Sequence, residues 1–316
     1  MSRAAPAALL ALLFLAGGRS ALAQDEPPDK GRLEYRPLLM FNQHLYYGTF
    51  SRPRGVAFDR EHGEVWVADS GNGLIGIYQP NGAEIYSFGS RQYLRDPVRI
   101  AMAPKGSIVI VEGDHAHVRV FNYRGNYKGD LTLTGIGEKP IIGAIAYDGD
   151  GQLYVAENRS SQIFVYRTDG TLKMQFGSRG TDEGQFRSVC GIAVDAQGTI
   201  YVADAQALAV QVFDSQGNFL RGWGKHEMGA ENFSLPSAIA VDSKGHIIVT
   251  DELRHQVKIF SAEGKLVAQF GSLGDQPGEL SFPSDVTVDD KDRIYVVERQ
   301  TARVQVFEPV DRPRSP

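Results

Sequence analysis

Short apolar runs separated by polar turns recur along the chain as a unit that repeats six times. The second run of each unit is rich in β-branched residues and closes on an acid, as in "EVWVAD", "SIVIVE", "QLYVAE", "TIYVAD", "HIIVTD" and "RIYVVE". The six acids are Asp69, Glu112, Glu157, Asp204, Asp251 and Glu298, spaced by 43, 45, 47, 47 and 47 residues. Such even spacing over most of a chain indicates a repeat architecture.

The turn signals divide each complete unit into four apolar runs, which predict four antiparallel strands. A glycine follows the first run in five units, and Asp292 takes its place in the sixth, where it can adopt the same left-handed conformation. Units of this length with four strands are typical of β-propeller blades. The predicted fold class is therefore all-β, a six-bladed β-propeller of four-stranded antiparallel blades.

The sixth unit ends after its third run, "RVQVFEP", whereas an unassigned run, "GRLEYRPLLMF", precedes the first unit. In that run Gly31 and Leu33 align with Gly264 and Leu266 of the fourth run of unit five. We therefore expect residues 31–41 to complete the last blade and to close the ring.

The N-terminus has the pattern of a secretory signal peptide: an early arginine, a short apolar run and small residues up to Ala23. We expect an exported protein, periplasmic or secreted after cleavage near Ala23. The predicted organisation is a signal peptide over 1–23, a short linker over 24–30, a single propeller domain over 31–308 and a C-terminal tail over 309–316.

Charge and cysteine content narrow the classes of partner. Cleavage removes Arg3 and Arg19, so 31 basic residues face 38 acidic ones and the net charge is −7. An acidic protein has no overall field that attracts nucleic acid, and no other apolar run reaches the ~20 residues of a membrane span. We expect neither nucleic acid nor a membrane span. Cys190 is the only cysteine, which excludes an internal disulfide.

The stretch "GNGLIG" at residues 71–76 has the glycine spacing of a dinucleotide-binding loop. That motif requires a helix after it, so that a helix N-terminus faces the phosphate. Here it lies between the runs "EVWVAD" and "IGIY" of the first unit. We interpret it as a hairpin turn and predict no dinucleotide.

The repeat resembles the NHL repeat, most clearly in unit five, "PSAIAVDSKGHIIVTDELRHQVKIF". The resemblance covers residues 31–308 and implies a propeller. It leaves function open, because NHL propellers include RNA-binding modules, protein-interaction domains, extracellular sensor domains and at least one metal-dependent lyase.

The candidate sites for chemistry are few. His115 and His117 form the best metal-like pair, but a metal site needs at least one more protein ligand. A solvated turn is the simpler interpretation, and we predict no cofactor. Cys190 begins the innermost strand of blade four, and we interpret it as a buried small residue. A metal-dependent lyase or hydrolase at the mouth of the central channel is kept as the alternative, and only it would require a divalent metal.

Arginines and aromatics gather in the segments that join blades and in the turns between second and third strands. These are residue types enriched at interface hot spots. The predicted function is thus a binding or scaffolding module for a protein, peptide or glycan partner, with the oligomeric state left open. The predicted contact residues are Arg54, Arg99, Arg159, Arg254, His255 and Arg303.

Overall fold

The computed structural model describes residues 33–89, 92–103 and 106–310, and these form six four-stranded antiparallel sheets. The predicted signal peptide, the linker and the last six residues lie outside the described part. From the innermost strand outward, blade 1 is β4 (Pro53–Asp59), β5 (Glu64–Asp69), β6 (Leu74–Tyr78) and β7 (Glu84–Phe88). Blade 2 is β8 (Pro97–Met102), β9 (Ser107–Glu112), β10 (Val118–Asn122) and β11 (Tyr127–Asp130). Blade 3 is β12 (Ile142–Tyr147), β13 (Leu153–Glu157), β14 (Gln162–Tyr166) and β15 (Leu172–Phe176).

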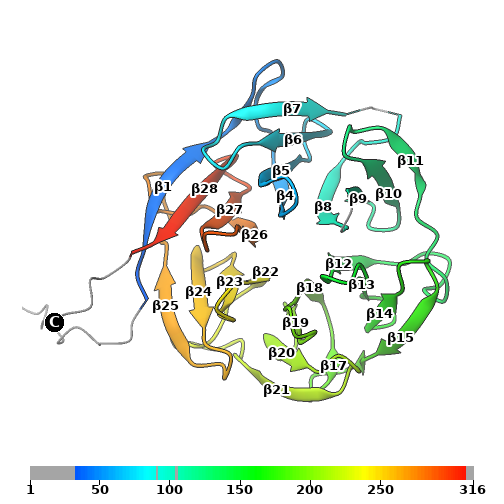
Figure 1. Ribbon diagram of the computed structural model, residues 1–316. Helices are drawn as coiled ribbons and strands as arrows, with labels where there is room; N and C mark the ends of the chain where they lie inside the picture. The colour runs from blue at the N-terminus through cyan, green and yellow to red at the C-terminus, as the bar shows by residue number, and fades with distance from the viewer. Residues whose placement is uncertain (1–32, 90–91, 104–105, 311–316) are drawn as a thin grey trace, which may run out of the picture. The chain divides into compact units, whose positions relative to one another are not determined.

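The second half of the ring follows the same order. Blade 4 is β18 (Val189–Val194), β19 (Ile200–Asp204), β20 (Val210–Phe213) and β21 (Phe219–Trp223). Blade 5 is β22 (Pro236–Val241), β23 (Ile247–Asp251), β24 (Gln256–Phe260) and β25 (Leu266–Phe270). Blade 6 is β26 (Pro283–Val288), β27 (Ile294–Glu298), β28 (Arg303–Pro309) and β1 (Tyr35–Phe41). The first strands of the six blades surround a common centre (Figure 1).

The predicted closure of the ring is confirmed. β1 pairs antiparallel with β28, from Tyr35 opposite Pro309 to Phe41 opposite Val304. One blade is thus built from both ends of the described chain, and the first strand of the chain cannot leave blade 6 without breaking the sheet that it completes. The predicted six-bladed, all-β architecture is confirmed as well.

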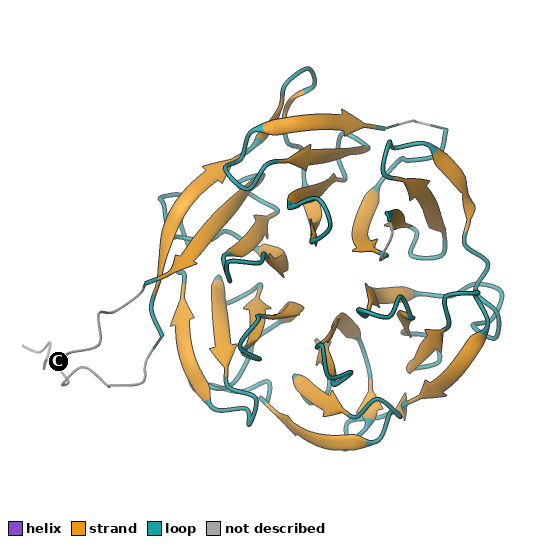
Figure 2. Ribbon diagram, in the orientation of Figure 1, coloured by secondary structure: helices purple, strands orange, loops and turns teal. Residues whose placement is uncertain are grey.

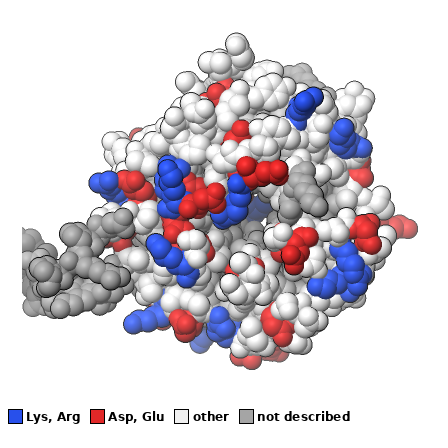
Figure 3. Space-filling model, viewed as in Figure 1, with Lys and Arg blue, Asp and Glu red and all other residues white. Residues whose placement is uncertain are grey.

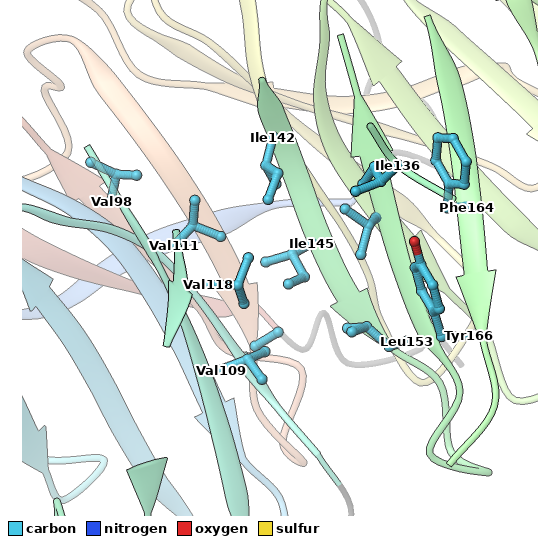
Figure 4. Close-up of a cluster of buried hydrophobic side chains, with 12 residues drawn as sticks. Val98, Val109, Val111, Val118, Ile136, Ile142, Ile145, Leu153, Phe164 and Tyr166 are labelled. Atoms are coloured by element: carbon cyan, nitrogen blue, oxygen red, sulfur yellow. The ribbon is translucent and has the colours of Figure 1, made fainter. Parts of the chain in front are cut away.

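The hydrophobic core lies between neighbouring blades rather than at one centre. In the layer between blades 2 and 3, for example, Val109 and Val111 of β9 pack with Ile142 and Ile145 of β12 and with Phe164 (Figure 4). Because both faces of each blade are covered in this way, the middle strands are apolar throughout instead of alternating. β5, β13, β19, β23 and β27 are accordingly buried along their full length.

Two glycine patterns of the repeat have separate structural causes. The left-handed turn after the first strand is present as predicted, with φ of 57° at Asp292. In blades 1, 2, 4 and 5 the glycine in the turn between third and fourth strands lies against the aromatic residue that ends the previous blade. A Cβ atom there would lie 3.1 Å from Phe41 at Gly82, 2.5 Å from Phe88 at Gly125, 2.8 Å from Phe176 at Gly217 and 2.6 Å from Trp223 at Gly264.

The acids that end the second strands bond to two segments of the chain. Glu157, Asp204 and Asp251 do accept backbone N–H bonds from the turns that follow them. All six also accept one from the segment that leads into their own blade. The donors are Ser51 to Asp69, Asp96 to Glu112, Ile141 to Glu157, Arg187 to Asp204, Ser234 to Asp251 and Ser281 to Glu298, at 2.7–3.1 Å. The acids therefore attach each link between blades to the blade that follows it.

A second polar column lies in the middle of the third strands and was not noticed in the sequence. Gln211, Lys258 and Gln305 occupy equivalent positions, opposite Val202, Val249 and Val296 of the second strands. All three side chains are fully buried. Gln211 donates to the Gln185 carbonyl, Gln305 to the Glu279 carbonyl and Lys258 to the Asn232 carbonyl, each in the link before its own blade.

The connections are otherwise short loops (Figure 2). No helix of the described residues is long and apolar enough to cross a membrane. Two further strand pairs occur in the links: the hairpin of β2 (Gln43–His44) with β3 (Gly48–Thr49), and the parallel pair of β16 (Ser178–Arg179) with β17 (Gln185–Phe186). "GNGLIG" is a hairpin turn as predicted: Gly73 has φ of 66° and β6 follows it directly.

Candidate functional site

The ring has two faces with different constituents. We call the face on which the innermost strands begin the link face, because it carries the links between blades and the turns from second to third strands. The opposite turn face carries the turns from first to second and from third to fourth strands. Figure 3 shows basic and acidic side chains interspersed around a central hollow on the face in view. Neither sign forms a continuous field there.

A cavity of about 950 Å³ follows the central axis. Its walls are the six innermost strands, and a ring of branched aliphatic residues surrounds it. These residues are Val56, Ile100, Ile145, Ile192, Ile239 and Val286. At the turn face the lining reaches Glu61, Gly149 and Gln197, whereas toward the link face it ends at Arg99, Cys190 and Asp285. The cavity is apolar along its length and polar at both ends.

Arg99, a predicted contact residue, crosses the axis instead of pointing outward. Its guanidinium donates to the carbonyls of Ser284 at 3.2 Å, Cys190 at 3.1 Å and Ser237 at 3.3 Å, in the three blades across the ring. It also lies 3.7 Å from the carboxylate of Asp285. Burial raises the pKa of Asp285, and Arg99 partly offsets that rise. Arg99 therefore closes the link-face end of the cavity and joins blade 2 to blades 4, 5 and 6.

Cys190 lines this closed end but lacks the chemistry of a nucleophile. Its thiol donates to the carbonyls of Pro236 at 3.2 Å and Ala203 at 3.4 Å. Burial raises the pKa of the thiol to about 12, and Arg99 lowers it by less. The thiolate is the reactive form of cysteine, so the protonated Cys190 serves as a packed side chain with two weak hydrogen bonds.

The two histidines of the metal-like pair do not converge. The Nδ1 atom of His115 lies 3.0 Å from the carbonyl of Ile142, whereas His117 pairs through Nδ1 with Asp114 at 2.5 Å. His115 adopts a left-handed backbone with φ of 57° in its turn. Among the described residues, three His, Cys, Asp or Glu side chains nowhere gather as metal ligands. The described part of the chain thus offers no ligand set for the metal-dependent alternative.

Most of the other predicted contact residues have partners within the ring. Arg303 is only 6% exposed and donates to Glu298 at 2.6 Å and to the Glu279 carbonyl at 3.0 Å. Arg254 donates to the Gly229 carbonyl at 2.6 Å and to Ser234 at 2.9 Å. These guanidiniums attach links to blades.

His255 and Arg159 each form one side-chain hydrogen bond within the ring. The Nδ1 atom of His255 accepts the backbone N–H of Phe282 at 3.2 Å. Exposed Arg159 donates to the Lys139 carbonyl at 3.1 Å.

Arg54 is different. It is the second residue of β4 and partly buried, yet its guanidinium has neither a hydrogen bond nor an ion pair among the described residues. Burial lowers its pKa, the charges of Arg299, Arg99 and Arg52 lower it further, and Asp96 acts in the opposite direction. Of the six predicted contact residues, Arg54 is the one whose side chain has no hydrogen-bond partner among the described residues.

The hairpin β2–β3 lies next to Arg54 in the chain and was not predicted. Its tip carries three exposed apolar side chains: Leu45 at 71%, Tyr46 at 85% and Tyr47 at 57% exposure. The hairpin projects beyond the rim beside β7 (Figure 1). Its signal in the sequence was the cluster "HLYYG", which has the composition of an exposed contact rather than of a blade strand.

A buried contact holds this hairpin in place. His44, 2% exposed, lies 3.0 Å from Asp69 of β5 through Nε2 and 3.0 Å from the hydroxyl of Tyr78 of β6 through Nδ1. The same ring lies 5.0 Å from the ring of Phe50. Because the base is fixed to blade 1, the aromatic tip is presented in a defined position.

The comparisons with known proteins agree with this architecture. The NHL repeat model matches residues 50–78, and the model of a six-bladed beta-propeller family matches residues 242–308. The Protein brain tumor of Drosophila melanogaster is 38% identical over 136 residues, which are 41% of this chain and 13% of that protein. The chain thus spans a small part of that relative.

A solved streptogramin B lyase structure has a TM-score of 0.64 to this one, with 13% identity, and covers 88% of this chain and 98% of its own. At that identity the likeness shows the fold alone. Fold and repeats define a six-bladed β-propeller. More narrowly, residues 50–78 match the NHL repeat, in agreement with the resemblance seen in the sequence.

Proposed function

We propose that this six-bladed propeller is an exported binding module that holds a protein or peptide partner on its link face, at blade 1. The observation that carries the proposal is the juxtaposition in one short segment of the exposed hairpin tip, Leu45 to Tyr47, with Arg52 and the unpartnered Arg54. Tyrosine and arginine are the residue types that contribute most at interface hot spots.

The ring provides the rigidity that such a site needs. Antiparallel pairing of β1 with β28 closes it, and the Arg99 bonds to three blades brace its centre. A site whose side chains are already fixed loses less conformational entropy on binding. Blade 1 can therefore present the aromatic tip and the arginines at constant separation.

The experiment is purification of the protein from its native host after mild cross-linking, with identification of what accompanies it by mass spectrometry. We expect one stoichiometric partner, lost when Tyr46 and Tyr47 are replaced by Ala. The control is Met228→Ala, which removes a 91% exposed apolar side chain from the link between blades 4 and 5, two links away from the one that carries the hairpin. Equal recovery from both variants would contradict the proposed site.

Export is tested in the same preparation. The protein should be recovered from outside the cytoplasm, and N-terminal sequencing of it should give a first residue near Gln24. A full-length chain recovered from the cytoplasm would contradict it.

A further inference from the structure

We infer that Arg52 and Arg54 form a receptor for a carboxylate group, so that the partner presents an acidic segment to blade 1. This inference rests on the proposed function and specifies the chemistry of the partner at that site. It starts from the Arg54 guanidinium, which has neither a hydrogen bond nor an ion pair among the described residues, although the charge of Asp96 acts on it from beyond ion-pair distance.

The backbone fixes where these two arginines and Arg299 lie. The Arg54 carbonyl accepts the hydroxyl of Ser284 at 3.3 Å, which attaches the start of β4 to the start of β26. The Arg299 N–H donates to the Phe282 carbonyl at 3.2 Å, two residues before Ser284. Arg52 precedes Arg54 by two residues and has φ of 50°. Arg52 and Arg54 therefore belong to the link face where blades 6 and 1 meet, whereas Arg299 lies on the link face of blade 6 and reaches Glu252 of blade 5.

The neighbouring acids are already engaged or too distant. Glu252 pairs with Arg299 at 2.5 Å, and Asp285 lies beside Arg99. Asp96 influences Arg54 through its charge but forms no ion pair with it within 4.0 Å. Exposed Arg52 likewise has no side-chain partner among the described residues. Two guanidiniums thus have unused donors.

Unused guanidinium donors favour an oxyanion over other ligands. A guanidinium presents N–H groups in a planar fork that matches both oxygens of a carboxylate. A partly buried charge without a counter-ion is costly, and an incoming carboxylate removes that cost. The exposed aromatic tip, which precedes the arginines in the same link, favours a polypeptide as the carrier, because it supplies apolar contacts in addition to the charged one. The net negative charge of the chain opposes a nucleic acid.

The test uses a fluorescein-labelled oligoglutamate peptide, with oligoglutamine of equal length as the uncharged control, and measures fluorescence anisotropy at low ionic strength. We expect the glutamate peptide to bind and the glutamine peptide not to bind. Arg54→Met should weaken binding about tenfold or more, since each charge-assisted hydrogen bond contributes a factor of that order. Arg54→Lys should restore binding only in part, because lysine lacks the fork.

The matched control is Arg124→Met, which removes an exposed arginine from the turn between β10 and β11 on the turn face. It should leave peptide binding unchanged. Arg54→Met should fold normally, because it removes an unpartnered charge from a cluster of like charges, and a thermal melt checks this. Equal loss from both variants would overturn the inference, and so would tighter binding of a single-stranded RNA than of the peptide.

Failure of this inference can be told from failure of the proposed function. If the partner is lost from the Tyr46 and Tyr47 variant but retained by Arg54→Met, the binding module stands and the carboxylate receptor is refuted. If no variant affects the partner while the glutamate peptide still depends on Arg54, the receptor stands and the proposed docking site is refuted.

Discussion

Lys258 offers a direct test of how the polar column holds blades to their links. Its side chain is fully buried in β24, its ammonium donates to the Asn232 carbonyl and lies 4.8 Å from the ring centre of Phe233. The equivalent residues of blades 4 and 6 are Gln211 and Gln305, which make the same type of contact without a charge. Lys258→Gln should therefore keep the hydrogen bond and remove a buried cation.

The magnitude follows from the pKa of Lys258. Burial, with a smaller contribution from Arg254, lowers it from 10.5 to about 8, while Asp251 acts in the opposite direction. Between these two values the unfolded chain holds the proton more tightly than the folded one, so stability rises with pH across that window. Below pH 8 the folded protein bears the full cost of keeping the buried ammonium charged. At ~1.4 kcal/mol per pKa unit, this cost is about 3 kcal/mol of the free energy of unfolding. Near pH 9.5 roughly half of it remains.

The assay is urea denaturation of the natural protein and of Lys258→Gln at neutral pH and near pH 9.5. We expect the variant to be more stable by about 3 kcal/mol at neutral pH and by only about 1.5 kcal/mol at the higher pH. Lys265→Gln controls for the loss of a charge, because Lys265 is exposed in the turn between β24 and β25. It should leave the free energy of unfolding unchanged at both pH values. A variant that is less stable at both pH values would refute the reasoning.

Three further predictions concern packing and closure. Gly217→Ala should lower the free energy of unfolding by about 2 kcal/mol more than Gly170→Ala. Both glycines have φ near 80°, but only at Gly217 would the new methyl group collide with the ring of Phe176. Equal shifts of the urea midpoint would contradict this prediction. Arg99→Met should cost about 3 kcal/mol by leaving Asp285 without its counter-charge. In an Asp285→Asn background the cost of Arg99→Met should be smaller. If the two substitutions instead lower the stability additively, the ion pair is contradicted. Deleting β1 should lower the melting temperature by roughly 10 °C or more, and an unchanged melt would refute ring closure.

The repeat pattern was sufficient to predict the architecture, because each blade repeats the same local rules. Even spacing of the "EVWVAD"-type runs predicted six blades, and the missing last run of unit six predicted that the strand over 31–41 would be supplied from the N-terminus. The left-handed turn at Asp292 was also predictable, since backbone conformation there depends on the residue and its immediate neighbours.

The partners of the arginines could not be predicted, because they depend on contacts across the ring. Arg99 binds carbonyls that lie 91, 138 and 185 residues away in sequence. Arg303 and Arg254 are engaged with the links that precede their own blades. The β2–β3 hairpin was missed because strands of two residues give no periodic pattern.

The central claim is that blade 1 holds the partner on the link face, and site-specific photo-crosslinking tests it most directly. A photoreactive phenylalanine analogue would replace Tyr46 in one preparation and Arg124, on the turn face, in the other. The account predicts a stoichiometric crosslink to one polypeptide from position 46 and none from position 124. A crosslink from position 124 alone, or from neither position, would contradict it.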